Sequence, residues 1–365
     1  MADIQGTCAE EFSAVRDALA ASLDNKDVGA SASVYVDGEM VVDIWGGYAD
    51  AARTTPWERD TITNVWSTTK TMVALCALIL ADRGDLDLDA PVARYWPEFA
   101  AAGKDGVLVR HVLSHTAGLP DWDGPVAVED LYDSPSVTAR LAAQAPFWEP
   151  GTEAGYHSLT FGFLVGELVR RVTGRSLGTF FAEDVAGPMG ADFHIGLAAE
   201  HDHRVAPVIA PPVSTSVDRI VRESGDARNG PIPPGVGNSV AWRRAEIPAA
   251  SGFGNARSVA AVQSVLANGG TARGVRLLSA AGCQRVREEQ FHGKDRIFGV
   301  PMRYGMGYAL NGNSCSWGGM GGSVVVVDLD AHMAVSYVMN QMLDEGGLSD
   351  ERGVGIVLAA YAGLS

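Results

Sequence analysis

A serine and a lysine lie three residues apart at the start of a long apolar segment. Ser67 and Lys70 precede residues 72–81, Met-Val-Ala-Leu-Cys-Ala-Leu-Ile-Leu-Ala, which are apolar on every side and therefore predict a buried helix. Residues three apart lie on one face of a helix. The positive end of the helix favours an oxyanion at Ser67 and, together with burial, disfavours protonated Lys70. A neutral Lys70 could take the Ser67 proton, so the pair could act as nucleophile and base.

The Ser-x-x-Lys pattern also fits a purely structural role. Ser67 or Thr68 could cap the helix N-terminus, and Lys70 could extend its charged end into solvent. Histidines offer a weaker alternative chemistry. His111 and His115 lie four residues apart, but the glutamate of the His-Glu-x-x-His zinc motif is missing. We therefore interpret His115 as a hydrogen-bonded residue at a helix end.

Two turn-rich segments strengthen the catalytic interpretation. Residues 150–158, Pro-Gly-Thr-Glu-Ala-Gly-Tyr-His-Ser, place Tyr156 at the end of a loop, and Ser158 is expected to cap a helix that begins near Leu159. Residues 317–322, Trp-Gly-Gly-Met-Gly-Gly, stand at the end of an expected strand, where glycines let backbone amides approach a ligand. A glycine-rich hairpin without a catalytic role is the alternative for this segment.

With these three motifs in this order, the chain resembles the serine β-lactamase and penicillin-binding protein superfamily. Within it, the chain most resembles the family VIII carboxylesterases, which are relatives of class C β-lactamases. The likeness extends from about residue 10 to the end of the chain. Further segments that resemble this family are residues 113–120 (Leu-Ser-His-Thr-Ala-Gly-Leu-Pro), 150–152 (Pro-Gly-Thr), 187–190 (Gly-Pro-Met-Gly) and 251–257 (Ser-Gly-Phe-Gly-Asn-Ala-Arg).

The resemblance implies a role for each motif. Ser67 would be the acylated nucleophile, Lys70 its activating partner and Tyr156 a proton relay. The backbone amides of Ser67 and Met320 would form the oxyanion hole. The expected substrate-binding residues are Ser158, Trp317, Gly318 and Gly319. No metal or cofactor is implied.

Two positions depart from the pattern of penicillin-recognising relatives. Those proteins usually have Asn where Ser158 stands and a Lys-Thr-Gly-like triad where Trp317-Gly318-Gly319 stands. The esterases that this chain resembles vary at the first position and accept Trp-Gly-Gly at the second. The departures argue against β-lactam turnover and leave acyl transfer intact.

Strand patterns occur at both ends of the chain. Residues 34–36 and 40–45 are rich in β-branched and aromatic residues and are joined by Asp37-Gly38, a strong two-residue hairpin turn. The same signal returns over residues 304–310, 314–317, 323–328 and 333–339, with an Asn311-Gly312 turn after the first of these runs. These segments predict short antiparallel strands.

Helices are expected beside these strands. Thr7 and Glu10 form a capping-box pattern ahead of an apolar face made by Phe12, Val15, Leu19 and Leu23. Residues 352–361 predict a last helix that lies on the sheet through Val354, Val357, Leu358 and Tyr361. Residues 107–114 and 159–172 predict two more helices, the second stopped by Gly174.

The expected fold is α+β and β-lactamase-like, an antiparallel sheet flanked by helices with an inserted, mostly helical lobe. Residues 1–85 together with 249–365 would form the sheet lobe, and residues 86–248 the helical lobe. We expect the active site in the cleft between them.

Composition limits the partners. The 365 residues carry 28 Lys plus Arg against 44 Asp plus Glu, a net charge of −16 that repels nucleic acid and anionic membranes. No apolar run reaches the ~20 residues of a membrane span, and the first residues lack the pattern of a secretory signal. Four widely spaced cysteines predict free thiols: Cys8, Cys76, Cys283 and Cys315. We therefore expect a soluble cytoplasmic protein of undetermined oligomeric state, without nucleic-acid or membrane partners.

These observations predict a serine hydrolase that cleaves carboxylic esters with short acyl groups. No Gly-x-Ser-x-Gly elbow is present, which argues against an α/β-hydrolase. A β-lactamase, a D-amino-acid peptidase, an amidase or an acyltransferase could use the same acyl-enzyme. A catalytically silent binding or assembly protein is the alternative from another class, against which the intact Ser67, Lys70 and Tyr156 argue.

Overall fold

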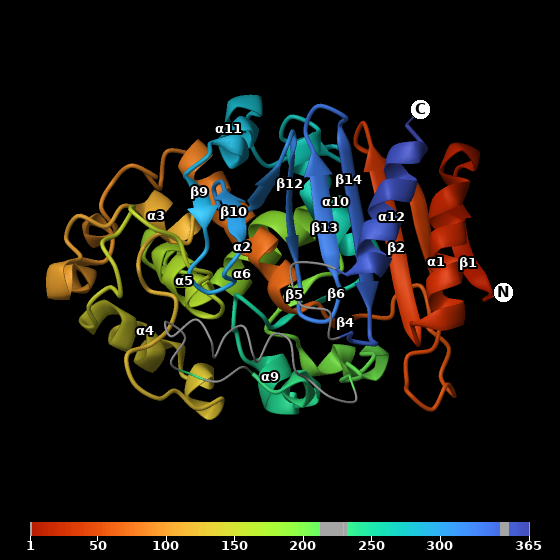
Figure 1. The fold of residues 1–365 in the computed structure, drawn as a ribbon, viewed down its shortest axis with the longest axis horizontal. Coiled ribbons are helices and arrows are strands. Elements are labelled where there is room, and N and C mark those ends of the chain that lie inside the picture. Colours follow the sequence, from red (N-terminus) through yellow and green to blue (C-terminus); the bar gives the residue numbers. More distant parts are fainter. Residues whose placement is uncertain (1, 212–228, 230–231, 344–349, 365) are drawn as a thin grey trace.

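A nine-stranded antiparallel sheet built from both ends of the chain forms the frame of the molecule (Figure 1). The structure is a computed structural model, and it describes residues 2–211, 229, 232–343 and 350–364. The strand order is β1-β3-β2-β14-β13-β12-β11-β10-β9. The strands are β1 (Ile4–Cys8), β2 (Gly29–Val36), β3 (Glu39–Gly47), β9 (Phe291–Lys294), β10 (Pro301–Tyr304), β11 (Ala309–Asn311), β12 (Ser314–Gly318), β13 (Val324–Asp328) and β14 (Met333–Met339). The two ends of the chain meet where β2 pairs with β14.

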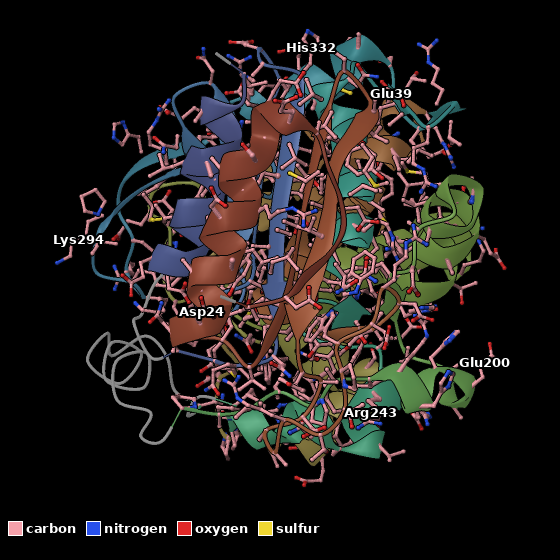
Figure 2. All side chains as sticks on the ribbon, turned by 90° about the vertical axis from the view of Figure 1, so that its right-hand side faces the viewer. Asp24, Glu39, Glu200, Arg243, Lys294 and His332 are labelled. Carbon is pink, nitrogen blue, oxygen red and sulfur yellow. The ribbon has the colours of Figure 1, made fainter. Side chains whose placement is uncertain are left out.

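Helices cover both faces of this sheet. On one face, α1 (Ser13–Asn25) and α12 (Glu351–Ala362) pack against each other and against the strands (Figures 1 and 2). On the other face, α10 (Ala256–Ala267) crosses β2, β13 and β14, and α2 (Thr69–Asp82) contacts α10 and β12. Strands such as β2 and β14 are therefore buried between helical layers, whereas the edge strands β1 and β9 are partly exposed. The expected α+β, β-lactamase-like class is confirmed.

The middle of the chain is mainly helical in the residues described. Its helices are α3 (Val109–Leu113), α4 (Ser134–Ala143), α5 (Thr160–Thr173), α6 (Leu177–Phe181), α7 (Gly187–Met189) and α9 (Val240–Arg244), followed later by α11 (Ala280–Gln284). A small sheet joins distant segments in the order β4 (Thr63–Asn64), β6 (Gly252–Gly254) and β5 (His194–Ile195), and β7 (Thr271–Ala272) pairs with β8 (Val275–Arg276). The division into lobes at residues 85/86 and 248/249 stays a prediction, and residues 212–228 lie outside the described residues.

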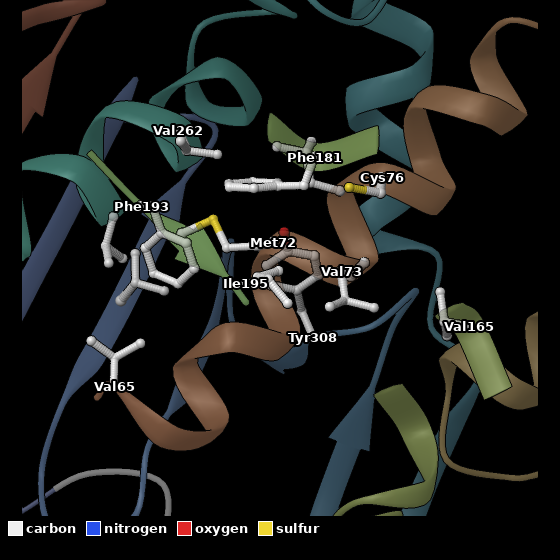
Figure 3. Close-up of a cluster of buried hydrophobic side chains, with 14 of the residues drawn as sticks. Val65, Met72, Val73, Cys76, Val165, Phe181, Phe193, Ile195, Val262 and Tyr308 are labelled. Carbon is white, nitrogen blue, oxygen red and sulfur yellow. The ribbon is translucent and has the colours of Figure 1, made fainter. Parts of the chain in front are cut away.

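Helix α2 lies in the interior, as its apolar sequence predicted. All its residues from 69 to 80 are buried. Met72 and Cys76 pack in a cluster with Phe181, Phe193 and Tyr308, which come from three other parts of the chain (Figure 3). The hydroxyl of Tyr308 donates to the carbonyl of Thr71 at 3.0 Å, so the polar end of this ring is satisfied by the helix itself.

Several expected elements are confirmed. Asp37 and Gly38 have φ angles of 50° and 80° in the turn between β2 and β3, which is the positive-φ geometry of a two-residue hairpin. Gly174 ends α5 with a φ of 74°. None of Cys8, Cys76, Cys283 and Cys315 is in a disulfide.

Three local expectations are wrong. Thr7 lies in strand β1 opposite Asp43, so the capping-box interpretation fails and α1 begins at Ser13. Residues 304–310 do not form one strand, because Tyr304 ends β10 and pairs with Ala309 of β11 across a turn. Strand pairing decided both cases, which a local pattern does not reveal.

The third correction concerns the buried face of α12. Val354 and Leu358 are 48% and 64% exposed, whereas Ile356 and Ala360 are buried. Val357 and Tyr361 are half-buried and pack against the core as expected, so the buried face of the helix is shifted toward Ile356 and Ala360. Arg352, near the start of the helix, forms a buried ion pair with Asp27.

Charged side chains lie around the outside of the described molecule. Figure 2 shows Lys294 and Glu200 near opposite edges and Asp24 on the face toward the viewer; these three side chains and Glu39 are exposed. None of the helices in the described ranges combines the length and hydropathy that a membrane crossing requires.

The different environments of two leucines give a test of this packing. Leu75 of α2 is fully buried, whereas Leu358 of α12 is 64% exposed. We expect Leu75→Ala to lower the free energy of unfolding by about 2–5 kcal/mol, because it leaves a cavity in the core. Leu358→Ala should change it by roughly 0.5 kcal/mol or less. Denaturant unfolding measures both, and equal effects would contradict the placement of α2 in the interior.

Candidate active site

The structure brings Ser67, Lys70 and Tyr156 together. Ser67 lies in the 3-10 turn Trp66–Thr68 that leads directly into α2. The Nζ atom of Lys70 lies 3.0 Å from Ser67 Oγ, and the Tyr156 hydroxyl donates to the same oxygen at 2.6 Å. The Nζ atom also donates to the carbonyl of Ala249 at 3.0 Å. One serine oxygen is therefore contacted by two titratable groups, one from its own helix and one from a loop 89 residues away.

Burial favours the neutral form of both partners of Ser67, which is the deprotonated amine for Lys70 and the protonated phenol for Tyr156. Lys70 is fully buried, and desolvation lowers its pKa well below the usual 10.5. Desolvation raises the pKa of Tyr156 to about 12, against contributions from the side chains of Ser67, Trp317 and Ser158 that favour the phenolate. A neutral amine can accept a proton and a neutral phenol can donate one. The geometry therefore favours Lys70 as the base and Tyr156 as a hydrogen-bond donor.

The residue before Ser67 has an unusual backbone conformation. Trp66 has a φ of 49°, which is rare for a bulky side chain. Its ring is buried and lies 5.7 Å from that of Trp242, and its carbonyl accepts from the hydroxyl of Thr69 at 2.5 Å. The N–H of Val65 donates to the carbonyl of Gly252 at 2.9 Å. These contacts hold a strained turn in place, and the sequence contains no signal for it.

The glycine-rich segment after β12 packs against the segment that carries Ser67. A Cβ atom at Gly319 would lie 2.2 Å from the carbonyl oxygen of Val65, so the two backbones approach more closely than a side chain permits. The hydroxyl of Ser323 donates to the same carbonyl at 2.9 Å and lies 3.0 Å from the hydroxyl of Thr68. The segment that contains Met320 is thereby fixed beside the start of α2. An oxyanion hole made by the amides of Ser67 and Met320 stays a prediction.

Trp317 lies behind Tyr156. Its side chain is fully buried, stacks on the ring of His115 at 5.2 Å and lies 5.5 Å from that of Tyr156. The indole therefore forms a neutral wall behind the phenol. In this conformation, contact between this segment and a substrate would involve backbone atoms at Gly318 and Gly319. Substrate binding by these three residues stays a prediction.

Ser158 differs from its expected structural role. Helix α5 begins at Thr160, and Leu159 occupies the capping position without a side-chain hydrogen bond. Ser158 is exposed and its side chain interacts with Tyr156, where it favours the ionised phenol. Its predicted role as a substrate-binding residue is compatible with this position but is not tested by it.

Two buried histidines support the loop that carries Tyr156. Nδ1 of His157 lies 2.6 Å from the carbonyl of Gly155, and Nε2 accepts from the N–H of Leu119 at 3.1 Å, which fixes the tautomer. Nδ1 of His115 accepts from the backbone N–H of His157 at 3.1 Å. Burial lowers the pKa of His157 to about 4 and that of His115 well below 6.5. Both rings are therefore neutral structural groups, as expected for His115.

A hairpin that the sequence analysis missed completes this side of the site. The ring of Phe298, between β9 and β10, stacks on Tyr156 at 4.7 Å with an interplanar angle of 16°. Asp295 holds the turn, because it accepts from the N–H of Phe298 at 2.7 Å and from the hydroxyl of Tyr304 at 2.7 Å. The short, partly polar strand β9 has a weak sequence signal, and only the tertiary structure places it beside Tyr156.

Within the described residues, no group of three or more His, Cys, Asp or Glu side chains is arranged to hold a metal ion. The groups that the structure brings together are the hydroxyl of Ser67, the amine of Lys70 and the phenol of Tyr156. This combination can carry out nucleophilic attack on a carbonyl carbon with proton transfer to the amine.

Comparisons with known proteins identify the family of this chain and agree with its fold. The sequence profile of the Beta-lactamase family matches residues 15–359, and the chain belongs to this family. It is 36% identical to the "Esterase/beta-lactamase LipL" of Mycobacterium tuberculosis (strain ATCC 25618 / H37Rv), over 96% of this chain and 86% of the relative. The curated relatives thus include a protein of almost the same extent.

Two solved structures extend the comparison. A family VIII carboxylesterase superposes with a TM-score of 0.92 and 45% identity, covering 99% of this chain and 100% of the other. A penicillin-binding protein homologue from Caulobacter crescentus superposes with a TM-score of 0.88 and 36% identity, with the same coverage. The resemblance to the serine β-lactamase and penicillin-binding protein superfamily is confirmed.

The neutral histidines make stability depend on pH. The pKa of His157 is about 4 in the folded protein against an ordinary value of 6.5, so the unfolded chain binds the proton more tightly. Stability should be complete above pH 6.5 and fall as the pH drops from 6.5 to 5, by about 1.4 kcal/mol per pH unit for each such histidine. Urea unfolding at several pH values measures the slope. His157→Gln should reduce it, whereas a change at the exposed His203 to Gln should not, and equal slopes in all three proteins would contradict this assignment.

Proposed function

We propose that this protein is a carboxylesterase that cleaves neutral esters with short acyl groups through a covalent acyl-enzyme on Ser67. The observation that carries the proposal is the convergence of Lys70 Nζ and the Tyr156 hydroxyl on Ser67 Oγ, at 3.0 and 2.6 Å. The family of the chain and its likeness to a family VIII carboxylesterase over 99% of its length support ester hydrolysis.

In the first half-reaction, Ser67 Oγ attacks the ester carbonyl carbon and its proton passes to the neutral amine of Lys70. The negative charge that develops on the carbonyl oxygen would be stabilised by the amides of Ser67 and Met320, next to the start of α2. The bond to the alkoxy group then breaks, and the leaving oxygen takes a proton from the Lys70 ammonium through the Tyr156 hydroxyl. The products are an alcohol and an ester of Ser67.

In the second half-reaction, water attacks the Ser67 ester. Lys70 is neutral again once the alcohol has left, so it can accept a proton from this water as it did from the serine. The carboxylic acid departs and Ser67 regains its proton. The carbonyl of Ala249 keeps the amine oriented throughout, because it accepts one of the Nζ hydrogens at 3.0 Å.

Location and partners complete the proposal. We place the protein in the cytoplasm, with which the free thiols of Cys76, Cys283 and Cys315 agree because disulfides are rare there. A small-molecule ester is the expected partner. Relatives of this chain are named esterases, β-lactamases and D-aminopeptidases, which makes a wider range of acyl substrates the alternative.

Ser67→Ala tests the nucleophile. We expect hydrolysis of p-nitrophenyl butyrate to fall on the order of 10³-fold or more, because no acyl-enzyme can form. Mass spectrometry of the wild-type protein treated with a p-nitrophenyl phosphonate should show one adduct, located on Ser67. A folded Ser67→Ala protein that keeps most of its activity would overturn the mechanism. A wild-type protein without ester turnover and without an adduct would favour the catalytically silent alternative.

The pH dependence tests the base. Protonated Lys70 cannot accept the serine proton, so kcat/KM should rise with pH through the lowered pKa of Lys70 and lose this dependence in Lys70→Arg, with a loss on the order of 10²–10⁴-fold. Tyr156→Phe should lower kcat and keep the ascending profile, because the phenol donates and is not the base. A profile that follows an ordinary histidine pKa of ~6.5 and disappears in His157→Gln would contradict the assignment.

The neutral surroundings of Ser67 predict selectivity for uncharged substrates. Trp317 stands where penicillin-recognising relatives have a lysine, and Lys70 is neutral, so a carboxylate would lose water without gaining a charged partner. We expect kcat/KM for p-nitrophenyl butyrate to exceed that for p-nitrophenyl hydrogen succinate, which differs by one carboxylate, and to exceed that for a cephalosporin. Comparable values for the two p-nitrophenyl esters would show that charge does not govern selectivity.

A further inference from the structure

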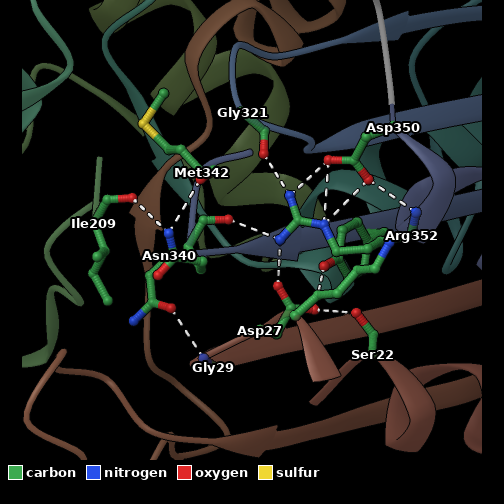
Figure 4. Close-up of polar contacts among 12 residues, drawn as sticks. Ser22, Asp27, Gly29, Ile209, Gly321, Asn340, Met342, Asp350 and Arg352 are labelled. Carbon is green, nitrogen blue, oxygen red and sulfur yellow. Dashed lines mark hydrogen bonds and ion pairs between the residues drawn. The ribbon is translucent and has the colours of Figure 1, made fainter. Parts of the chain in front are cut away.

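A buried arginine at the start of α12 binds two carboxylates and also a backbone carbonyl. The side chain of Arg352 is 1% exposed (Figure 4). Its Nη1 atom lies 2.5 Å from Asp27 Oδ1 and its Nη2 atom 2.6 Å from Asp350 Oδ2. Burial lowers the pKa of Arg352, but interactions with Tyr337, Asp350 and Asp27 outweigh this effect and raise the pKa above its usual value. A buried guanidinium needs such partners, because an unpaired one would be strongly destabilising.

The same guanidinium also binds the glycine-rich segment. Nη2 donates to the carbonyl of Gly321 at 2.6 Å, and the N–H of Leu343 donates to this carbonyl at 3.1 Å. Gly321 directly follows Met320, whose amide is the proposed second donor of the oxyanion hole. Arg352 therefore binds the residue that directly follows Met320, whose amide must be placed accurately for catalysis.

The segment forms a tight turn with Met320 at its second position. The N–H of Gly322 donates to the carbonyl of Gly319 at 3.1 Å, and the N–H of Gly319 donates to the carbonyl of Ser323 at 2.7 Å. Gly321 has a φ of 88°, the value that the third residue of such a turn requires. These bonds close the base of the turn. Its outer corner, at Gly321, is held by Arg352 and Leu343.

Close packing shows that the guanidinium fits against this turn. A Cβ atom at Gly322 would lie 2.2 Å from Asp350 Oδ2 and 2.4 Å from Arg352 Nη2. Any side chain at Gly322 would displace the ion pair. The glycine therefore permits the contact between the turn and the charged group.

The other end of the network is fixed to the core. Oδ2 of Asp27 accepts from the hydroxyl of Tyr337 on β14 and from the hydroxyl of Ser22 on α1, both at 2.5 Å. Asp27 is fully buried. Through Asp27, Arg352 thus connects the corner of the turn to β14 and α1.

We infer that Arg352 is a positioning residue for the oxyanion hole, which it serves by anchoring the turn that carries the Met320 amide. It acts through Gly321 and does not contact the reacting atoms. The inference rests on the proposed function, since it assigns to the turn the task of stabilising the oxyanion.

Arg352→Lys tests this role. A lysine keeps the charge that compensates Asp27 and Asp350, but it lacks the planar fork that serves both carboxylates and Gly321 together. With p-nitrophenyl butyrate we expect kcat to fall on the order of 10- to 100-fold while KM stays within about threefold, because the lost interaction acts mainly in the transition state. The affinity for phenylboronic acid, which forms a tetrahedral adduct with the serine, should fall in parallel.

Tyr337→Phe is the matched control. It removes the hydroxyl that donates to Asp27 Oδ2 but keeps the ring over which the Arg352 guanidinium lies at 5.8 Å and keeps every hydrogen bond of Arg352, so kcat should stay within about twofold of the wild type. Equal losses of kcat in the two variants, or a loss in Arg352→Lys that appears in KM alone, would show that the network only stabilises the fold and would overturn the inference.

Asp27→Asn carries the test if Arg352→Lys does not fold. This substitution weakens the hydrogen bond from Arg352 Nη1 to residue 27 without leaving an unpaired charge. We expect kcat to fall several-fold more than in Tyr337→Phe, and an equal effect would overturn the inference.

Ser67→Ala, measured in the same assay, distinguishes failure of the proposed function from failure of the positioning role. An active Ser67→Ala protein would refute the proposed function, whereas an inactive one beside an unimpaired Arg352→Lys protein would refute the positioning role alone.

Discussion

The burial of one amine is the constraint on which the site depends. Lys70 lies on a helix that is enclosed on every side, and water cannot solvate its charge there. Since a buried ammonium without a carboxylate partner is costly, the neutral form is favoured and becomes a base at ordinary pH. Burial of α2 thus determines the protonation state of Lys70 in its first turn, and with it the ability of this amine to act as a base.

A neutral Lys70 can act as a base only if it is oriented toward Ser67 and the groups around the serine are fixed. The carbonyl of Ala249 orients Nζ, and the hydroxyl of Tyr156 approaches Ser67 from the other side. The segment after β12 comes within van der Waals distance of the Val65 carbonyl because Gly319 has no side chain. Lys70 and Tyr156 thus meet at Ser67 Oγ, while the segments that carry Ala249 and Gly319 hold the amine and the start of α2 in place.

The surroundings of Tyr156 differ from those of a site built to bind an anion. The indole of Trp317 and the ring of Phe298 lie against the phenol, and His115 beside them is neutral. Burial raises the pKa of the phenol here, although the Trp317 side chain itself favours the phenolate, and the aromatic rings offer no charge to a substrate. The relatives of this chain share the scaffold, so differences in the walls around the serine are a physical basis for differences in what each protein cleaves.

The sequence by itself determined the local features. The apolar run after Lys70 predicted a buried helix, the Asp37-Gly38 turn predicted the hairpin, and the order of the three motifs predicted the family, because each depends on neighbouring residues. Tertiary structure decided the rest. The buried face of α12, the stacking of Phe298 on Tyr156 and the contact between Arg352 and the turn after Met320 depend on pairings between distant segments. A local pattern cannot specify which distant group satisfies a buried charge or carbonyl, since that choice is made by the packing of the whole chain.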